Sequence, residues 1–469
     1  MKPRILASLL LIFPLTTLAQ LPQIDELMAN HVPTAAVGLW VQDAESKEVL
    51  YTHNPSQGFT PASITKSFTA AATLLDLAPD YAYQTTLAYD KTQHQGTRLN
   101  GDLAVIFTGD PSLTTQDFNH LLLNIKTLGV AQIDGDILID NSYFSKPYTA
   151  RGTVAEDAHW YFGTPVTSII LDENQIPVTV KSGARLGQRV TFSLNTPINA
   201  PLTANVTTVS EEESKTLCQL NVVLNPKDNG IAFYGCWPIN TKQPTTQLKV
   251  ALANPELRVE QLINDFLQQE GIVLTGKIRI APSQQTPDTL AQHTSAPLPT
   301  LNAMSMQRSN NLYANSLAKV LGKNNYQRGT LQAGSYAIVE ILKNNLNLPV
   351  QKMRLFDGSG ESTYNQITPE ITAQLLQAMY DHENLRQPFF DTMEVSGPQH
   401  SFYSRLPKSV VPPVYMKTGS MTGVSNITGY LKTQHGRTLI FVCLLNQLPL
   451  DRSQAHLFEQ KLLEQLNGM

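Results

Sequence analysis

The chain has 469 residues, which is too long for a single compact core and predicts two to four domains. Hydrophobic residues make up 42% of the chain and charged residues 15%, a balance typical of globular proteins that excludes a largely disordered one. The net charge is −4 and no basic run stands out, so the sequence gives no electrostatic support for nucleic-acid binding.

The first 19 residues have the pattern of a secretory signal peptide. Lys2 and Arg4 give a positive start, residues 5–13 are almost wholly apolar, and small residues precede the expected cleavage point after Ala19. The alternative is an uncleaved anchor helix, but the apolar stretch is short for a membrane span and Pro14 interrupts it. We therefore expect a periplasmic or otherwise exported protein that is at most peripherally bound to a membrane.

Short strand patterns dominate the region that follows. Residues 36–51 have the pattern of a strand, a turn and a second strand, and a helix rich in Ala and Leu is expected at 63–77, after Pro61. From 85 to 293 short strand patterns succeed one another, and a helix predicted at 256–270 interrupts them.

Two cysteines flank a turn-rich segment in this region. Cys218 and Cys236 are equidistant from Lys227, which lies in a run of Asn, Pro, Asp and Gly that favours a turn. A hairpin centred on Lys227 would place them opposite each other, so we expect a disulfide; the alternative is two reduced, half-buried cysteines. Cys443 lies in an apolar run typical of a buried strand and is expected to be a core residue.

The last third of the chain changes to helical patterns. Residues 286–300, rich in Pro, Thr, Ser and Gln, are expected to form a linker, and helical patterns then run from 301 to 345. Two strands are expected at 429–431 and 438–445, and a terminal helix at 453–466.

Three short motifs follow one another along the chain: Ser63-Ile64-Thr65-Lys66, Ser309-Asn310-Asn311 and Lys417-Thr418-Gly419. A serine and a lysine three residues apart share one face of a helix. A serine hydroxyl needs an adjacent base, and burial or a neighbouring positive charge lets a lysine lose its proton near neutral pH. The backbone amide at such a helix start also stabilises an oxyanion.

Each motif by itself is a weak signal. Ser316-Leu317-Ala318-Lys319 repeats the first motif, and Ser193-Leu194-Asn195 mimics the second. The ordered set is favoured by its context, because Ser63 opens a helix and the single Lys-Thr-Gly follows an apolar stretch that reads as an edge strand. The ten histidines lack metal-ligand spacing, and no P-loop or dinucleotide fingerprint is present, so neither a metal nor a cofactor is expected.

The chain resembles the class C low-molecular-mass penicillin-binding proteins, which are serine D-alanyl-D-alanine carboxypeptidases and endopeptidases. The three motifs match the S-x-x-K, S-x-N and K-T-G set of penicillin-binding proteins and β-lactamases. The resemblance covers almost the whole chain after residue 19, and it includes 59–63, 109–113, 133–136, 356–360 and 417–425.

The resemblance implies an α+β multidomain fold. A penicillin-recognising domain, an antiparallel sheet flanked by helices, would carry a large β-rich insertion of two further domains. Residues 20–84 and 294–469 would form the discontinuous peptidase domain. Inserted domain II would comprise 85–172 and 271–293, and inserted domain III 173–270.

The resemblance also implies a role for each motif residue. Ser63 would be the acylated nucleophile and Lys66 its general base. Ser309 and Asn311 would relay protons and hold the substrate amide, and Lys417 would supply positive charge near Ser309 and the substrate carboxylate.

The rest of the third motif would bind the substrate. Thr418 would bond its carboxylate, and the Gly419-Ser420 segment would complete the oxyanion hole through the amide of Ser420. Two residues depart from the family pattern: Asn310 stands where Asp is common, and Ser67 where an apolar residue is usual. Neither is expected to prevent catalysis.

Two further stretches are open to a functional or a structural interpretation. Asp357-Gly358-Ser359-Gly360 could line the cleft, but its dipeptides are ordinary turn formers, so a structural turn is favoured. The same interpretation is favoured more strongly for Gly109-Asp110-Pro111, because it lies in the insertion.

The implied function is hydrolysis of the terminal D-Ala–D-Ala bond, or of a D-amino-acid cross-link, in peptidoglycan peptides through an acyl-enzyme on Ser63. β-Lactams would acylate and inhibit the same serine. The alternatives are a β-lactamase, an esterase or aminopeptidase on the same scaffold, and a non-catalytic peptidoglycan-binding protein.

Overall fold

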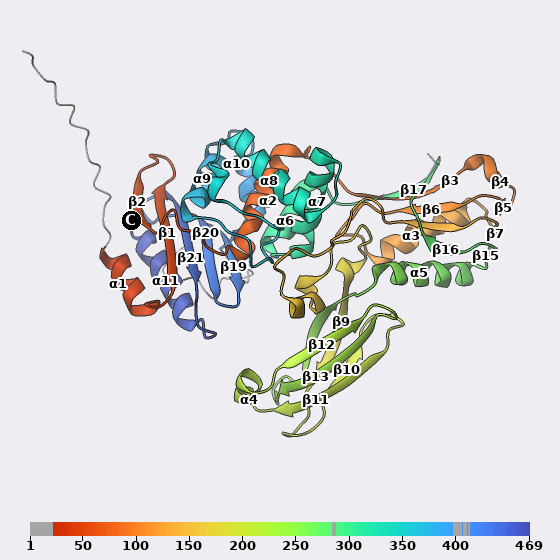
Figure 1. Cartoon of the computed structure of the whole chain (residues 1–469), viewed down its shortest axis with the longest axis horizontal. Coiled ribbons are helices and arrows are strands. Elements are labelled where there is room, and N and C mark those ends of the chain that lie inside the picture. Colours follow the sequence, from red (N-terminus) through yellow and green to blue (C-terminus); the bar gives the residue numbers. More distant parts are fainter. Residues whose placement is uncertain (1–21, 284–287, 397–405, 407–409, 411–412) are drawn as a thin grey trace, which may run out of the picture.

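The computed structural model describes residues 22–283, 288–396, 406, 410 and 413–469, so the predicted signal peptide lies outside the described residues. The chain forms three domains, with domain I on the left of Figure 1, domain II on the right and domain III below. Domain I is built from both ends of the described chain, and the insertion between them forms domains II and III. Within the described residues no helix is long and apolar enough to cross a membrane.

Domain I is a six-stranded antiparallel sheet covered by helices on both faces. Its strand order is β18-β19-β20-β21-β1-β2. The strands are β1 (Ala36–Asp43), β2 (Val49–His53), β18 (Glu394–Val395), β19 (Val414–Met421), β20 (Val424–Lys432) and β21 (Thr438–Asn446). The helices are α1 (Pro22–His31), α2 (Thr65–Asp76), α6 (Leu298–Gln307), α7 (Asn311–Tyr326), α8 (Leu331–Leu346), α9 (Pro369–Asp381), α10 (Arg386–Thr392) and α11 (Ser453–Asn467).

The sequence of β21 explains why both faces of this sheet are covered. Successive side chains of a strand point to opposite faces. Ile440, Val442 and Leu444 pack in the core beneath α2, α7 and α9. The alternate residues of β21, which include Phe441 and Cys443, pack in a second core with α1 and α11. Cys443 is fully buried there, as expected.

The predicted linker at 286–300 is wrong for most of its length. Residues 284–287 lie outside the described part, but β17 (Asp288–Thr294) pairs antiparallel with β3 (Gln84–Tyr89), and α6 begins at Leu298. The strand was missed because the segment is polar and half exposed, whereas pairing with β3 satisfies its backbone. The helical stretch predicted at 301–345 is broken where Ser309 and Gln327 adopt positive φ angles of 50° and 56°.

Domain II has two sheets and two long helices. A five-stranded sheet has the order β16-β8-β6-β3-β17, and a four-stranded sheet has the order β15-β7-β5-β4. Its remaining strands are β4 (His94–Gln95), β5 (Arg98–Leu99), β6 (Leu103–Ile106), β7 (Gln132–Ile133), β8 (Ile137–Asp140), β15 (Val273–Leu274) and β16 (Ile278–Ile280). Its long helices are α3 (Thr115–Thr127) and α5 (Pro255–Glu270).

The structure places α5 in domain II, whereas the sequence analysis assigned its residues, as part of 173–270, to domain III. Its buried residues, among them Val259, Ile263 and Phe266, pack in one core with Phe118 of α3. Burying such a stripe is worth about 1.5–3 kcal/mol per large apolar side chain, and it fixes the helix to the sheet that the stripe covers.

Domain III consists of two three-stranded sheets, ordered β10-β9-β14 and β11-β13-β12, with the short helix α4 (Glu211–Thr216). Its strands are β9 (Gln175–Lys181), β10 (Thr191–Leu194), β11 (Leu202–Val209), β12 (Leu220–Asn225), β13 (Gly230–Pro238) and β14 (Thr245–Ala251).

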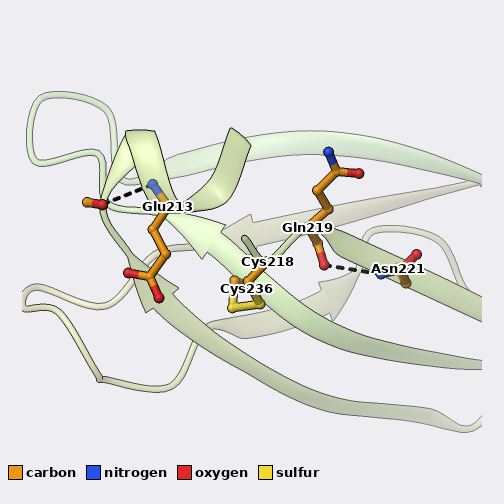
Figure 2. Close-up of a disulfide and its surroundings, with 6 residues drawn as sticks. Glu213, Cys218, Gln219, Asn221 and Cys236 are labelled. Atoms are coloured by element: carbon orange, nitrogen blue, oxygen red, sulfur yellow. Dashed lines mark hydrogen bonds between the residues drawn. A yellow bond between two sulfur atoms is a disulfide. The ribbon is translucent and has the colours of Figure 1, made fainter. Parts of the chain in front are cut away.

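A disulfide joins Cys218 and Cys236 in domain III (Figure 2). The turn of the neighbouring hairpin is centred half a residue later than expected. Asn225 pairs with Gly230, so the centre lies between Lys227 and Asp228 and not at Lys227. Cys218 consequently lies just before β12 rather than within it, and the bond ties the segment after α4 to β13.

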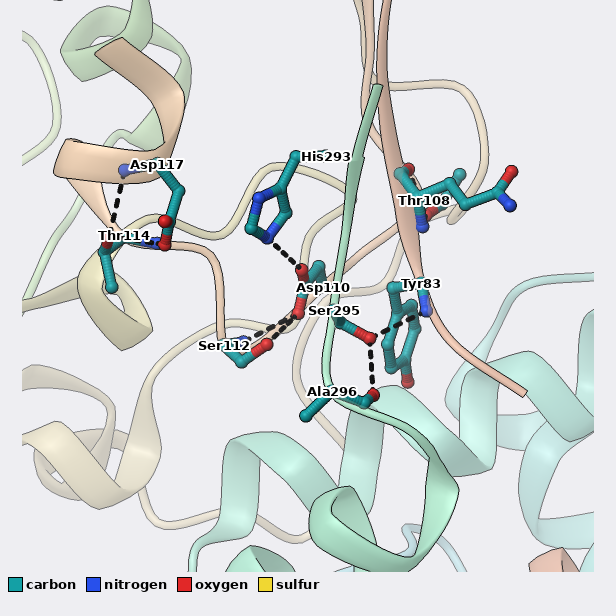
Figure 3. Close-up of polar contacts among 10 residues, drawn as sticks. Tyr83, Thr108, Asp110, Ser112, Thr114, Asp117, His293, Ser295 and Ala296 are labelled. Carbon is teal, nitrogen blue, oxygen red and sulfur yellow. Dashed lines mark hydrogen bonds and ion pairs between the residues drawn. The ribbon is translucent and has the colours of Figure 1, made fainter. Parts of the chain in front are cut away.

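The two segments that connect domain I to domain II, at Tyr83 and at Ser295, lie side by side in Figure 3. The Tyr83 amide donates to Ser295 Oγ at 2.9 Å. The buried carboxylate of Asp110 accepts from the Ser112 amide at 2.8 Å and lies 3.7 Å from His293 Nε2. Gly109-Asp110-Pro111 is thus part of a structural turn at the domain junction, as favoured from the sequence.

Candidate active site

Ser63 and Lys66 lie at the start of the buried helix of domain I. Ser63 belongs to a short 3-10 helix, η1 (Ala62–Ile64), which leads directly into α2, so the helix expected at 63–77 has a tighter first turn. Lys66 Nζ donates to Ser63 Oγ at 2.7 Å, to Asn311 Oδ1 at 2.6 Å and to the Ser359 carbonyl at 2.8 Å. The first two motifs therefore meet on one ammonium group.

Lys66 is fully buried, and its burial determines how readily the amine loses its proton. Burial, and then the positive charge of Lys417, hold the pKa of Lys66 well below its usual value, while the carboxylates of Asp357 and Glu361 act in the opposite direction. A lysine with a lowered pKa is a base near neutral pH, and one of its three hydrogen-bond partners here is the Ser63 hydroxyl.

The second motif forms the turn between α6 and α7. Ser309 adopts a positive φ of 50°, and Asn310 caps α7 by accepting from the amides of Leu312 and Tyr313. Asp and Asn cap helices about equally well, so the departure at Asn310 leaves the helix start intact. The Asn310 amide also donates to Glu173 Oε2 at 2.8 Å, a bond that an Asp carboxylate could not donate.

The third motif lies on β19, close to the outer edge of the sheet. The two-residue strand β18 pairs only with Tyr415 and Met416, so the described part of the structure leaves β19 unpaired on that side from Lys417 onward. Lys417 Nζ donates to Ser309 Oγ at 3.0 Å and to the Thr418 carbonyl at 2.9 Å. Burial lowers the pKa of Lys417 to about 8, and the carboxylate of Glu394 opposes that shift.

Two glycines let the motifs approach each other. A Cβ at Gly419 would lie 2.6 Å from the Pro61 carbonyl, so only glycine lets β19 pass this close to the turn that carries Ser63. Gly360 has a φ of 89°, and a Cβ there would lie 1.8 Å from the Ala62 carbonyl. Any side chain at either position would push the loop or the strand away from the serine.

The Asp357–Gly360 stretch is a structural turn, as favoured, but it also contacts the site directly. The buried Asp357 carboxylate accepts from the amides of Gly360 and Ser362 and from Asn365. The turn thereby holds the Ser359 carbonyl against Lys66. A backbone carbonyl has no side-chain signature, so this contact could not be predicted from the residue types.

A cavity of about 540 Å³ opens in front of these groups. Domain I lines it with Ser63, Ser309, Asn311 and Ser420, among others, while Lys66 and Lys417 are buried. Thr418 is half-buried on β19 beside them.

The insertion supplies the opposite wall of the cavity. Residues 145–166, which we call the wall loop, line it with Asp157, Tyr161 and Phe162. Glu173, just before β9, and Lys249 of β14 line it as well. These residues carry no motif, and the sequence analysis missed them. Only the path of the chain between the domains reveals them.

One further carboxyl group faces the cavity from domain I. Glu361 lines the cavity, and its Oε1 atom is buried without a hydrogen-bond partner among the described residues. Burial, together with the nearby carboxylate of Asp357, raises the pKa of Glu361 to about 8.

The two look-alike motifs lie elsewhere. Ser193 is exposed on β10 of domain III. Ser316 and Lys319 are buried in the middle of α7, where Ser316 Oγ donates to the Gly109 carbonyl and Lys319 Nζ to the carbonyls of Ser145 and Val166. Lys319 therefore has other partners than its own serine.

Comparison with known proteins agrees with this geometry. The chain is 28% identical to "D-alanyl-D-alanine carboxypeptidase DacB" of Haemophilus influenzae over 439 residues, which cover 92% of this chain and 90% of the relative. The crystal structure of penicillin binding protein 4 (dacB) from Haemophilus influenzae superposes with a TM-score of 0.85 at 27% identity, covering 95% of this chain and 99% of that one. The same protein complexed with a β-lactam superposes with a TM-score of 0.80 at 26% identity, covering 95% and 100%.

The fold class and the family expected from the motifs are thereby confirmed. Residues 20–465 match the model of one peptidase family, which is nearly the full length of the chain and includes both insertions. This chain belongs to the D-Ala-D-Ala carboxypeptidase 3 (S13) family of serine peptidases.

Proposed function

We propose that this chain is an exported D-Ala-D-Ala carboxypeptidase and endopeptidase that cleaves peptidoglycan peptides through an acyl-enzyme on Ser63. The observation that carries the proposal is the 2.7 Å contact between Ser63 Oγ and the buried Nζ of Lys66. Because burial and Lys417 disfavour the charged form of Lys66, this amine is suited to accept the hydroxyl proton.

In acylation, Ser63 Oγ bonds to the carbonyl carbon of the penultimate D-Ala, and its proton passes to Lys66 Nζ. The bond from that carbon to the terminal D-Ala nitrogen then breaks, and the leaving amine takes a proton delivered through Ser309. The backbone amides of Ser63 and Ser420 stabilise the oxyanion, a contribution worth about 3–4 kcal/mol per donor in comparable enzymes. Water then attacks the ester and regenerates Ser63.

The third motif suits a substrate that ends in a free carboxylate. Lys417 and Thr418 would bind that group, with Lys417 held in place by Ser309 at 3.0 Å. The pKa of Lys417, about 8, keeps it largely protonated at neutral pH. A β-lactam presents a carboxylate and a reactive carbonyl in a similar arrangement, so it would acylate Ser63 and block the site.

An extracytoplasmic location is part of the proposal. The Lys2 and Arg4 start, followed by an apolar stretch, supports export with cleavage near Ala19. The disulfide between Cys218 and Cys236 supports an oxidising compartment, such as a periplasm. Nothing in the net charge of −4 favours nucleic acid as a partner.

The test is covalent labelling by a fluorescent penicillin, with the Ser63→Ala variant beside the wild type. We expect the wild type alone to be labelled, with an adduct stable for minutes, and to release D-Ala from a peptide ending in D-Ala–D-Ala. Label that disappears within seconds while free drug is consumed would replace the peptidase with a β-lactamase. An unlabelled wild type would overturn the acyl-enzyme and leave a non-catalytic binding protein.

A further inference from the structure

Lys319 is a buried lysine that the proposed reaction does not use. It is fully buried in α7, and its Nζ donates to the carbonyl of Val166 at 2.7 Å and to that of Ser145 at 3.2 Å. The same nitrogen lies 5.1 Å from the ring centre of Phe144 and 5.0 Å from that of Tyr148. A buried amine requires such partners, since leaving it unpaired would be costly.

Both backbone partners of Lys319 are the ends of the wall loop. The loop leaves domain II at Ser145 and returns at Val166, and its ends are closed by a bond from the Val166 amide to the Tyr148 carbonyl at 2.9 Å. The Ser145 amide also donates to the Gly329 carbonyl of domain I at 2.9 Å. The base of the loop is therefore attached to domain I, and Lys319 contacts both of its ends.

The middle of the wall loop reaches the catalytic cavity. The Phe162 carbonyl accepts from Asn311 Nδ2 at 2.8 Å, and the Gly152 carbonyl accepts from the Thr363 amide at 3.0 Å. On its other side, His159 Nδ1 lies 2.8 Å from the Val222 carbonyl of domain III. The loop is thus held between two domains, and its position determines where the residues that line the far side of the cavity lie.

We infer that Lys319 is a positioning residue for substrate binding, which fixes the base of the wall loop and thereby places Asp157, Tyr161 and Phe162 against the part of the peptide that precedes the scissile bond. This inference rests on the proposed function. Without Lys319, the buried carbonyl of Val166 and the partly buried carbonyl of Ser145 would lose this donor, and the base of the loop would move to find other partners. Ser63, Lys66 and Lys417 are held by α2, β19 and the Ser359 carbonyl, independently of the loop. Asn311 would lose its bond to Phe162 but keep its bond to Lys66, so the chemistry itself would remain.

The test compares Lys319→Met with Lys323→Met, one turn further along α7. Lys323 also lies over a ring, at 5.6 Å from the centre of Tyr143, which makes it a matched loss of a lysine on the same helix. Each variant is assayed with a pentapeptide ending in D-Ala–D-Ala, which fills the cavity, and with an acetylated D-Ala–D-Ala dipeptide, which does not reach the wall. Acylation by benzylpenicillin is measured in parallel.

For Lys319→Met we expect KM for the pentapeptide to rise about tenfold with kcat changed less than twofold. KM for the dipeptide and the rate of penicillin acylation should stay within about twofold of wild type, and Lys323→Met should resemble wild type throughout. If Lys319→Met does not fold, Tyr148→Leu removes a ring beside Nζ from the loop side and should give the same split with a smaller, about threefold, rise in KM.

Equal losses on pentapeptide and dipeptide, or a Lys319→Met enzyme indistinguishable from Lys323→Met, would overturn the inference while leaving the proposed function intact. A wild type that neither takes the penicillin label nor releases D-Ala would overturn the proposed function, and the inference would fall with it.

Discussion

The chain contains the four-residue motif S-x-x-K twice, at Ser63–Lys66 and at Ser316–Lys319, and the two sites are used in different ways. Both lysines are fully buried, and burial lowers the pKa of each. Lys66 donates to its own serine, whereas Lys319 donates to two backbone carbonyls and its serine bonds elsewhere.

The difference lies in what surrounds each pair. Ser63 stands on the 3-10 turn before α2 and faces the cavity, while Ser316 is buried in the middle of a helix. Lys66 also has a second lysine, Lys417, close enough to lower its pKa further, whereas burial alone lowers the pKa of Lys319, to about 7. A buried amine is thus insufficient for this chemistry, which also needs a hydroxyl that a substrate can reach.

The largest expected effect separates the two lysines by reactivity. Lys66→Gln removes the base and should slow acylation by a fluorescent penicillin about 10³-fold, within the range for general-base groups. Lys319→Gln should leave that rate within a few-fold of wild type. The second-order rate constant from stopped-flow labelling measures both, and comparable losses in the two variants would contradict the distinction.

A second test uses the dependence of stability on pH. The folded-state pKa of Lys319, about 7, lies below the ordinary value of 10.5, so between these pH values the unfolded chain binds the extra proton and stability rises with pH. In the middle of that window Lys319 contributes a slope of about 1.4 kcal/mol per pH unit. Unfolding by urea at pH 8 and 9.5 should show this slope reduced in Lys319→Met.

The matched control for this experiment is Ser316→Ala, which removes the other half of the same motif but no titrating group. It should lower stability equally at both pH values and keep the wild-type slope. A slope unchanged in Lys319→Met would mean that this amine stays charged in the folded protein.

An intermediate effect is expected at the start of α7, the helix that links the two sites. Asn310→Asp keeps the helix cap but turns the donor to Glu173 into a second carboxylate. We therefore expect the activation free energy of acylation to rise by about 1–2 kcal/mol, which corresponds to a roughly tenfold slower acylation. The double variant Asn310→Asp, Glu173→Gln restores a donor–acceptor pair and should recover most of the loss. No recovery in the double variant would show that the contact with Glu173 is unimportant.

The smallest effect concerns the carboxyl group near Lys66. Burial and the nearby Asp357 carboxylate keep the Glu361 carboxyl protonated up to about pH 8, so at pH 7 its negative charge, which would raise the pKa of Lys66, is largely absent. Glu361→Gln replaces one uncharged group by another and should therefore acylate within about twofold of the wild-type rate at pH 7. The rate of labelling by the fluorescent penicillin at pH 7 provides the measurement, and a change of about tenfold or more would show that the carboxyl group is charged there.

The sequence alone determined the chemistry and the outline of domain I. The spacing of Ser63 and Lys66 requires only that they lie on one helix, and this local property is readable from the chain. The continuous apolar run of β21 likewise predicts a strand buried on both faces, since each side chain has to meet a core. The order of the three motifs then indicated the family.

Only the tertiary structure decided what the second S-x-x-K contacts, where α5 belongs and what forms the far wall of the cavity. Each depends on contacts between residues distant in the sequence, such as Lys319 with Val166 and Asn311 with Phe162. Several of those contacts are made by backbone carbonyls, which every residue possesses and no sequence pattern marks. Residue types state which groups are present, and the packing of the domains decides which of them meet.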